Sequence, residues 1–188
     1  MSDFLPHPFW NFSLELYAGE GVVEACLDLQ ERRGCDVNVL LFCCWLGASG
    51  RPTLTADRLR AILKASDAWQ AEIVRPLRAV RRLLKDRRWP ETEPGAMPEL
   101  VDAVRRRVAD AELAAEHAEQ IRLASLHSPP ADRDRPVDKR LRAAVGNLGV
   151  YAVCLGVVPD ARDRAAGVAL MRGTFPALTD DEIKRVVG

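Results

Sequence analysis

Apolar residues recur every three or four positions along most of the chain, which is the spacing of one face of an α-helix. The most regular stretch forms one stripe with a mean spacing near 3.6 residues: Leu59, Ile62, Ser66, Trp69, Ile73, Leu77, Val80 and Leu84. Pro76 falls inside this stripe and removes one backbone donor. Because the stripe keeps its phase across the proline, the pattern predicts one long helix with a kink near Glu72–Pro76.

Capping residues and glycines delimit further helices towards the N-terminus. Pro8 suits a first helical turn, and Gly34 suits the left-handed C-cap of a helix over 22–33. Asp36 is a natural N-cap for the apolar run that follows, because its carboxylate can accept the free amides of the first turn. That run is apolar nearly all round and lacks strand-like alternation, so we expect a buried helix over 37–46.

The second half of the chain has the same helical character. A long helix is predicted from Pro98 to Leu126, with seven positions inward: Leu100 or Val101, Val104, Val108, Ala111, Ala115, Ala118 and Ile121. Three shorter helices are predicted over 137–157, 159–172 and 179–187. The last begins with Thr179 and Glu182 at the spacing of a capping box.

These elements predict an all-α fold, a single-domain helical bundle of about six to eight helices with the long proline-kinked helix. We expect one domain over residues 1–188, with a helical core at 8–126 and C-terminal helices at 137–188. The polar, proline-rich stretch between them predicts a mobile loop at 127–136.

Charge is balanced overall but segregated along the chain. The 188 residues carry 27 Lys and Arg and 27 Asp and Glu, which excludes a uniformly basic nucleic-acid coat. Residues 1–50 have 2 basic and 7 acidic side chains, whereas residues 51–89 have 11 basic and 4 acidic ones. Residues 90–126 have 4 basic and 8 acidic side chains. The position of each segment in the fold therefore matters more than the total.

The cysteines and the apolar runs indicate a cytoplasmic protein. The five cysteines lack the spacing of a disulfide framework or a zinc site, so we expect reduced and mostly buried thiols. The N-terminus lacks the basic and apolar regions of a signal peptide. The longest apolar run, at 39–48, is far shorter than the roughly 20 residues that span a bilayer, so no membrane association is expected.

No catalytic, cofactor or metal motif is present, and we expect no catalytic residue, cofactor or metal ligand. Asp160 and Asp163 form a D-x-x-D that resembles magnesium–diphosphate sites of helical enzymes, but a second aspartate-rich helix is missing. Glu112, Glu116 and Glu119 share one helix face, for which a solvated or ion-paired row is the stronger interpretation.

A basic ridge is the stronger candidate site. Its members share one side of the predicted kinked helix and are Arg75, Arg78, Arg81, Arg82 and Lys85, widened by Arg87 and Arg88. Such a ridge could bind RNA, DNA or another polyanion in a salt-dependent way. Aromatic residues stand only at its two ends, Trp69 and Trp89, so base stacking has little support. The alternative, which we favour, is that the ridge is solvated or pairs with the acidic helix that follows.

The N-terminal third combines aromatic residues with polar residues in apolar settings. The candidate pocket or buried polar network consists of Trp10, Tyr17, Gln30, Asp36, Asn38 and Trp45. Buried amides need partners, so we expect Asn38 and Gln30 to bond to the backbone or to each other. A core network is the favoured interpretation, and a pocket or aromatic docking surface is the alternative.

Four segments together carry a family resemblance: F-W-N-F-S-L-E-L-Y at 9–17, A-C-L-D-L-Q at 25–30, G-C-D-V-N-V-L-L-F at 34–42, and Trp45. The helix with Trp69 and the Pro76-Leu77-Arg78 step continues the likeness. The chain resembles a family of small proteobacterial proteins defined by a domain of unknown function. The resemblance implies a bacterial cytosolic protein and assigns no activity, cofactor or active-site residue.

The leading functional hypothesis is a non-enzymatic interaction or accessory protein with an unknown protein partner or with itself as partner. The first alternative is polyanion binding through the basic helix at 75–88. The second is a helical enzyme that acts on a diphosphate or lipid-like substrate near Asp160 and Asp163.

Overall fold

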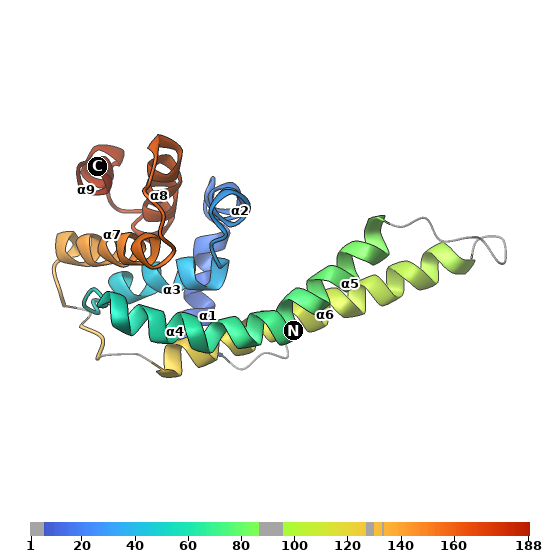
Figure 1. Ribbon diagram of the computed structural model, residues 1–188. Helices are drawn as coiled ribbons and strands as arrows, with labels where there is room; N and C mark the ends of the chain where they lie inside the picture. The colour runs from blue at the N-terminus through green and yellow to red at the C-terminus, as the bar shows by residue number, and fades with distance from the viewer. Residues whose placement is uncertain (1–5, 87–95, 127–129, 133) are drawn as a thin grey trace. The chain divides into compact units, whose positions relative to one another are not determined.

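The computed structural model describes residues 6–86, 96–126, 130–132 and 134–188. Its elements in chain order are α1 (Pro8–Tyr17), α2 (Val22–Arg33), α3 (Val37–Ala48), α4 (Ala56–Trp69), η1 (Gln70–Val74), α5 (Arg75–Asp86), α6 (Ala96–Leu126), α7 (Val137–Cys154), α8 (Ala161–Thr174) and α9 (Asp180–Val187). Within the described ranges every regular element is helical, so the all-α prediction is confirmed (Figure 1). With α4, η1 and α5 counted as one continuous helix, the described chain has eight helices.

The chain divides into two compact units. The hairpin unit comprises Lys64–Glu119 of the described chain, and the core unit comprises Leu5–Leu63 and Gln120–Gly188. Both boundaries fall inside helices, so α4 and α6 each contribute residues to both units. A single domain over 1–188 remains a prediction. The predicted mobile loop at 127–136 falls partly outside the described residues, at 127–129 and 133.

The core unit is built around α3. Ten of its twelve residues are buried, which is why its sequence is apolar on every side. Helix α7 crosses it closely, because Gly47 on α3 has no Cβ to hold Ala144 of α7 away. Phe9 of α1 stacks on Trp45 with ring centroids 5.1 Å apart, and Phe42 meets Phe9 edge to face at 5.5 Å.

Local capping predictions are confirmed. Gly34 ends α2 with φ of 68°, and the Asp36 carboxylate accepts the backbone N–H of Asn38 at 2.8 Å to start α3. Thr179 and Glu182 form the predicted capping box of α9. The structure adds a second capping box at the start of α8, made by Asp160 and Asp163.

The long helix of the hairpin unit passes Pro76 without ending. The turn before the proline is π-helical, and there the N–H of Arg75 donates to the carbonyl of Gln70, five residues back. This element sits where the kink was predicted. A π turn holds one more residue than an α turn, so it rotates the faces of α5 relative to α4.

Beyond Trp69 the predicted apolar stripe is therefore wrong at Ile73 and Val80, whereas Leu77 and Leu84 lie on the half-buried side as predicted. Leu59, Ile62 and Ser66 are buried as expected, but Ile73 is 38% exposed and Val80 is 44% exposed. The buried or half-buried side of this helix follows a shifted set of positions: Gln70, Val74, Leu77, Arg78, Arg81 and Leu84.

The inward face predicted for α6 is also partly wrong. Leu100 and Val104 are 61% and 47% exposed, whereas Glu112 and Glu119 are buried at 5% and 1%. The helix starts at Ala96 rather than Pro98. Its less exposed side in the hairpin unit follows a spacing of four and three: Val101, Arg105, Val108, Glu112, Ala115 and Glu119.

All five cysteines lie in the described residues and have free thiols; four are buried and Cys154 is half-buried, as predicted. Burial raises the pKa of the Cys26 and Cys44 thiols to about 12. None of the helices traced through the described chain combines the length and apolarity that crossing a bilayer requires.

Candidate functional site

The hairpin unit is held together by a polar seam. The buried carboxylate of Glu119 on α6 accepts a hydrogen bond from the hydroxyl of Ser66 and another, at 2.6 Å, from Gln70 Nε2. One turn earlier on α6, the carbonyl of Ala115 accepts from Trp69 Nε1 at 3.0 Å. Sequence reasoning placed Glu119 in an acidic row but did not identify these partners.

The basic ridge joins this seam at two of its five positions. Arg78 Nε lies 2.9 Å from Glu112 Oε1 and its Nη2 lies 2.7 Å from Glu116 Oε1, and Arg81 also bonds to Glu112. Burial raises the pKa of Glu112, but hydrogen bonds from Arg81 and Arg78 outweigh it and lower that pKa below its usual range. The favoured pairing of the ridge with the acidic helix is thus observed for these two arginines.

The remaining ridge residues are exposed. Arg75 approaches Asp67 at 3.4 Å on the surface of the same helix. Arg82 and Lys85 have no ion pair with another residue of the described chain. Arg87, Arg88 and Trp89 lie outside the described residues. The ridge as a polyanion site therefore remains a prediction that depends on Arg75, Arg82 and Lys85.

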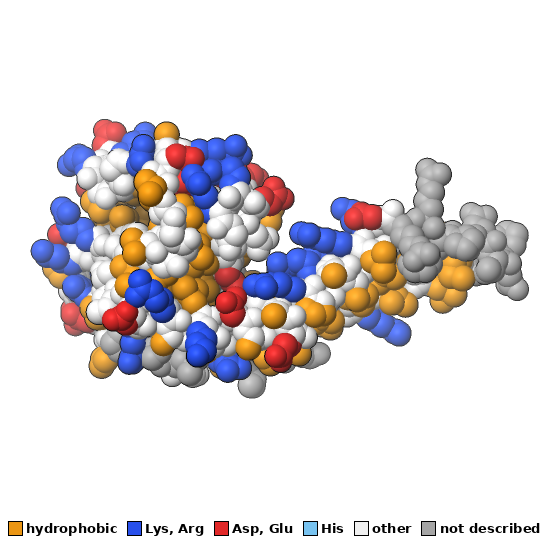
Figure 2. All heavy atoms as spheres, in the orientation of Figure 1, with side chains coloured by type: hydrophobic (Ala, Val, Ile, Leu, Met, Phe, Trp, Pro, Cys, Tyr) orange, Lys and Arg blue, Asp and Glu red, His pale blue; other side chains and the backbone are white. Residues whose placement is uncertain are grey.

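The exposed apolar residues of η1, α5 and α6 form one surface, which we call the apolar face: Ile73, Val80, Leu83, Leu100 and Val104. Each of these residues comes one position before a residue of the seam side, on both helices. A step of one residue turns a side chain by about 100° around the helix axis. Because the two helices run antiparallel, this step turns the side chains of both helices from the inward direction towards the same side of the pair. Figure 2 shows this segregation, with hydrophobic side chains along one edge of the pair and Lys and Arg along the other.

The predicted N-terminal network is part of the core unit. Trp10 and Trp45 are buried, and the Arg51 guanidinium lies 4.2 Å from the Trp45 ring centroid. Tyr17 and Gln30 are half-buried on α1 and α2. The structure thus places these four side chains in or beside the core.

Asp36 and Asn38 are brought together at the start of α3. Asn38 Oδ1 accepts from Gln120 Nε2 at 2.8 Å, so its partner is a residue 82 positions away rather than Gln30. The backbone N–H of Asp36 donates to the Tyr151 hydroxyl at 2.8 Å. Gln120 and Tyr151 were not among the predicted site residues, because no local pattern links them to α3.

An apolar cavity of about 160 Å³ lies within the core unit. It is bordered by α2, α3, α7, α8 and α9 and is partly open to solvent, and its lining includes Leu29, Leu40, Leu148, Tyr151, Leu170 and Met171. Cys35 also lines it, and burial raises the pKa of this thiol to about 11. The cavity was not predicted, because its walls come from segments more than 100 residues apart.

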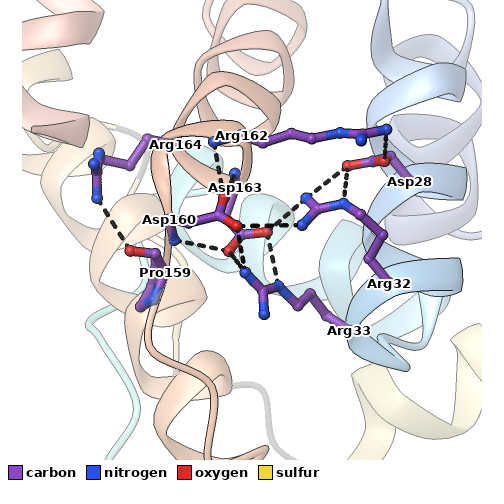
Figure 3. Close-up of polar contacts among 8 residues, drawn as sticks. All are labelled: Asp28, Arg32, Arg33, Pro159, Asp160, Arg162, Asp163 and Arg164. Carbon is purple, nitrogen blue, oxygen red and sulfur yellow. Dashed lines mark hydrogen bonds and ion pairs between the residues drawn. The ribbon is translucent and has the colours of Figure 1, made fainter.

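An ion-pair cluster stands at one side of this cavity and joins α2 to α8 (Figure 3). Asp163 Oδ2 lies 2.7 Å from Arg33 Nη2, and Asp163 Oδ1 lies 2.8 Å from Arg32 Nη2. Asp28 bonds to Arg32 at 2.7 Å and also pairs with Arg162.

The two aspartates of the D-x-x-D are occupied within this cluster. Burial raises the pKa of Asp163, but hydrogen bonds from Arg33, the backbone N–H of Asp160 and Arg32 outweigh it and lower that pKa to about 2. Asp160 also accepts from Arg33 at 2.6 Å and caps α8. These bonds use the oxygens that a magnesium ion would need. No group of three His, Cys, Asp or Glu side chains in the described chain has a metal-binding arrangement.

Comparison with known protein families gives a match for this chain. The model of the family described as "Protein of unknown function (DUF2390)" matches residues 8–123, which include the α3 helix and the whole hairpin unit of the described chain. The chain matches no curated protein and no solved structure. Because the family model covers more than half of its residues, the chain belongs to the DUF2390 family of proteins.

Proposed function

We propose that this protein is a non-enzymatic interaction protein that associates with a second copy of itself through the apolar face of the hairpin unit. The observation that carries the proposal is that α5 has no buried residue although its sequence is strongly amphipathic. A soluble helix normally buries its apolar stripe, and an uncovered stripe is typical of an interface.

The composition of the seam explains why the apolar face is left over. Hydrogen bonds and ion pairs at Glu112 and Glu119 hold α6 to its neighbour on the inward side, together with inward apolar residues such as Val74, so the leucines and valines of the apolar face are not used for packing within the hairpin. These side chains are then available for a partner. A hairpin that meets another hairpin along such a face forms a four-helix bundle.

Charge favours a second copy as that partner. The exposed border of the apolar face carries Glu72 on η1 and Arg82 on α5, and Glu99 and Arg107 on α6. Each border therefore carries charges of both signs, so a second copy can offer charges opposite to those of the first. The formal net charge of zero also means that two copies do not repel each other at long range.

The size of the face sets the strength of the expected dimer. The 17 residues of η1 and α5 span about 25 Å, and two helices are about 20 Å wide, which gives roughly 500 Å² per copy. A total of about 1,000 Å² is at the lower limit of specific interfaces. We therefore expect reversible dimerisation at micromolar concentration.

Sedimentation of the full chain over a concentration series tests the proposal. We expect a monomer–dimer equilibrium that the double variant Val80→Glu with Leu83→Glu shifts to monomer at all concentrations. Leu113→Glu is the matched control, because Leu113 is 42% exposed but lies away from the apolar face on α6. A wild-type chain that stays monomeric, or a dimer that survives the double variant, would overturn the proposal.

Polyanion binding is the second candidate, supported by the exposure of Arg75, Arg82 and Lys85. Its weakness is that Arg78 and Arg81 are already paired with carboxylates. Electrophoretic retardation of RNA or DNA at low salt, lost in Arg75→Glu with Arg82→Glu, would support it. Absence of retardation at low salt would exclude it.

The bacterial origin and cytoplasmic location implied by the sequence belong to the same proposal. Free, largely buried thiols support a reducing compartment. The bonded state of Asp160 and Asp163 weighs against the diphosphate enzyme considered above, because both carboxylates already cap α8 and pair with arginines.

A further inference from the structure

The apolar cavity of the core unit is bordered by two glycines in the middle of helices. Gly149 lies in α7 and Gly167 in α8, and both line the cavity. Neither has a positive φ, so the backbone does not require glycine at these positions. Glycine inside a helix costs about 1 kcal/mol relative to alanine. The absence of a side chain there thus has a cost in stability and a consequence for the cavity.

Gly149 is exposed at the edge of the cavity and Gly167 is half-buried, so the missing side chains leave this edge open. A Cβ built on Gly149 meets no other atom within 4 Å, and one on Gly167 meets only Val187 Cγ1, at 3.4 Å. Close packing against a neighbouring helix, the usual reason for a helical glycine, therefore does not apply at Gly149. Gly47 provides the contrast within the same unit, since a Cβ there would overlap Ala144.

The polar side of the cavity carries charged side chains of both signs, and one of its arginines has no carboxylate partner among the described residues. Figure 3 draws four arginines and three aspartates of this cluster, and the Asp36 carboxylate lies near the lining residues Cys35 and Tyr151, whose pKa values are raised by burial and also by this carboxylate. Arg32, Arg33 and Arg162 pair with the aspartates. Arg164 lines the cavity from an exposed position on α8, and among the described residues it donates to the carbonyl of Pro159, at 3.1 Å.

We infer that this cavity binds a small monocarboxylic acid, with its apolar part inside and its carboxylate at Arg164. The volume limits the apolar part, because a cavity of about 150 Å³ accommodates a molecule the size of benzene. Hexanoate and benzoate are of this size, whereas a membrane-lipid acyl chain is too long. The Asp163 carboxylate at the same side is neutralised by Arg32 and Arg33, so it does not repel the ligand.

Calorimetric titration of the full chain with hexanoate, hexanol and hexylamine tests the inference. We expect saturable binding of hexanoate, binding of hexanol about tenfold weaker, and the weakest binding for hexylamine. Equal binding of the acid and the alcohol would overturn the role of Arg164, and no saturable binding of any of the three would overturn the site.

Two variants locate the binding. Gly149→Leu places a side chain at the mouth and is expected to remove binding of both hexanoate and hexanol. Arg164→Gln is expected to weaken hexanoate about tenfold, to the level of hexanol, and to leave hexanol unchanged. Ala165→Leu is the matched control, because Ala165 is exposed on α8 and does not line the cavity.

Folding is monitored separately, by thermal unfolding of each variant without ligand. A Gly149→Leu chain that is folded and still binds hexanoate at wild-type strength would refute the assignment of the ligand to this cavity. If Arg164→Gln still binds hexanoate more tightly than hexanol, the ligand carboxylate does not lie at Arg164 and this assignment is refuted. Neither result depends on whether the hairpin unit dimerises.

Discussion

Gly47 of α3 lies so close to Ala144 of α7 that a Cβ on Gly47 would overlap the backbone N and Cα of Ala144. We expect Gly47→Ala to push the two helices apart and lower the free energy of unfolding by about 1–3 kcal/mol, although alanine is the better helix former. Urea unfolding followed by circular dichroism measures this change.

Gly149→Ala should act in the opposite direction. A methyl group at Gly149 meets open space, so only the helix propensity changes, and we expect the free energy of unfolding to rise by about 0.5–1 kcal/mol. Comparison of the two variants separates the effect of helix–helix packing on the free energy of unfolding from the effect of helix propensity. Equal effects of the same sign would contradict the close crossing of α3 and α7.

Asn147 is a buried polar anchor between α7 and the segment before α4. Its side chain is fully buried, and Oδ1 accepts the backbone N–H of Leu54 at 2.8 Å. Asn147→Leu would leave that buried N–H without an acceptor, which we expect to cost about 1–3 kcal/mol in urea unfolding. Asn11→Leu, on the exposed side of α1, is the control and should change stability little. Equal losses in the two variants would count against this role for Asn147.

Features set by neighbouring residues were predictable from the sequence. The αL cap at Gly34, the N-cap at Asp36 and the Thr179 capping box depend on backbone groups within a few positions. A single sequence shows such arrangements directly, because residue type and spacing are enough to define them.

Features that depend on distant residues were not predictable in this way. The π turn η1, just before Pro76, moves the inward position of the long helix from Ile73 to Val74, whereas the predicted stripe assumed a constant 3.6 residues per turn. The bond between Asn38 and Gln120 joins residues that no local pattern connects. Each candidate site depends on one of these two effects. The apolar face is exposed because the π turn rotates the helix, and the cavity is formed by residues that lie far apart in the sequence.

The buried carboxylate of Glu119 should stabilise the hairpin unit more than the core unit. Glu119→Ala removes the acceptor for Ser66 and Gln70, both of which are buried. We expect a loss of about 1–3 kcal/mol and faster hydrogen–deuterium exchange in peptides from Lys64–Asp86. Glu99→Ala, an exposed change on the same helix, is the control. Exchange that rises equally in α3 and α7 peptides would contradict a local role.

The Asp163 ion pairs make stability depend on pH in a defined direction. The folded-state pKa of Asp163 is about 2, below the ordinary value of 3.8. A carboxyl with a lowered folded-state pKa contributes stability that is present above its unfolded pKa and lost as the pH falls through the folded one. The contribution of Asp163 should therefore disappear between about pH 4 and pH 2.

Asp163→Asn tests this dependence, because asparagine keeps the size of the side chain but not its charge. We expect the variant to melt several degrees lower at pH 7, with a difference from wild type that shrinks as the pH falls from 4 to 2. Asp181→Asn is the control, an exposed aspartate in the first turn of α9. Thermal unfolding at pH 7, 4, 3 and 2 gives the comparison. A difference that stays constant across this range would show that the charge of Asp163 is not what joins α2 to α8.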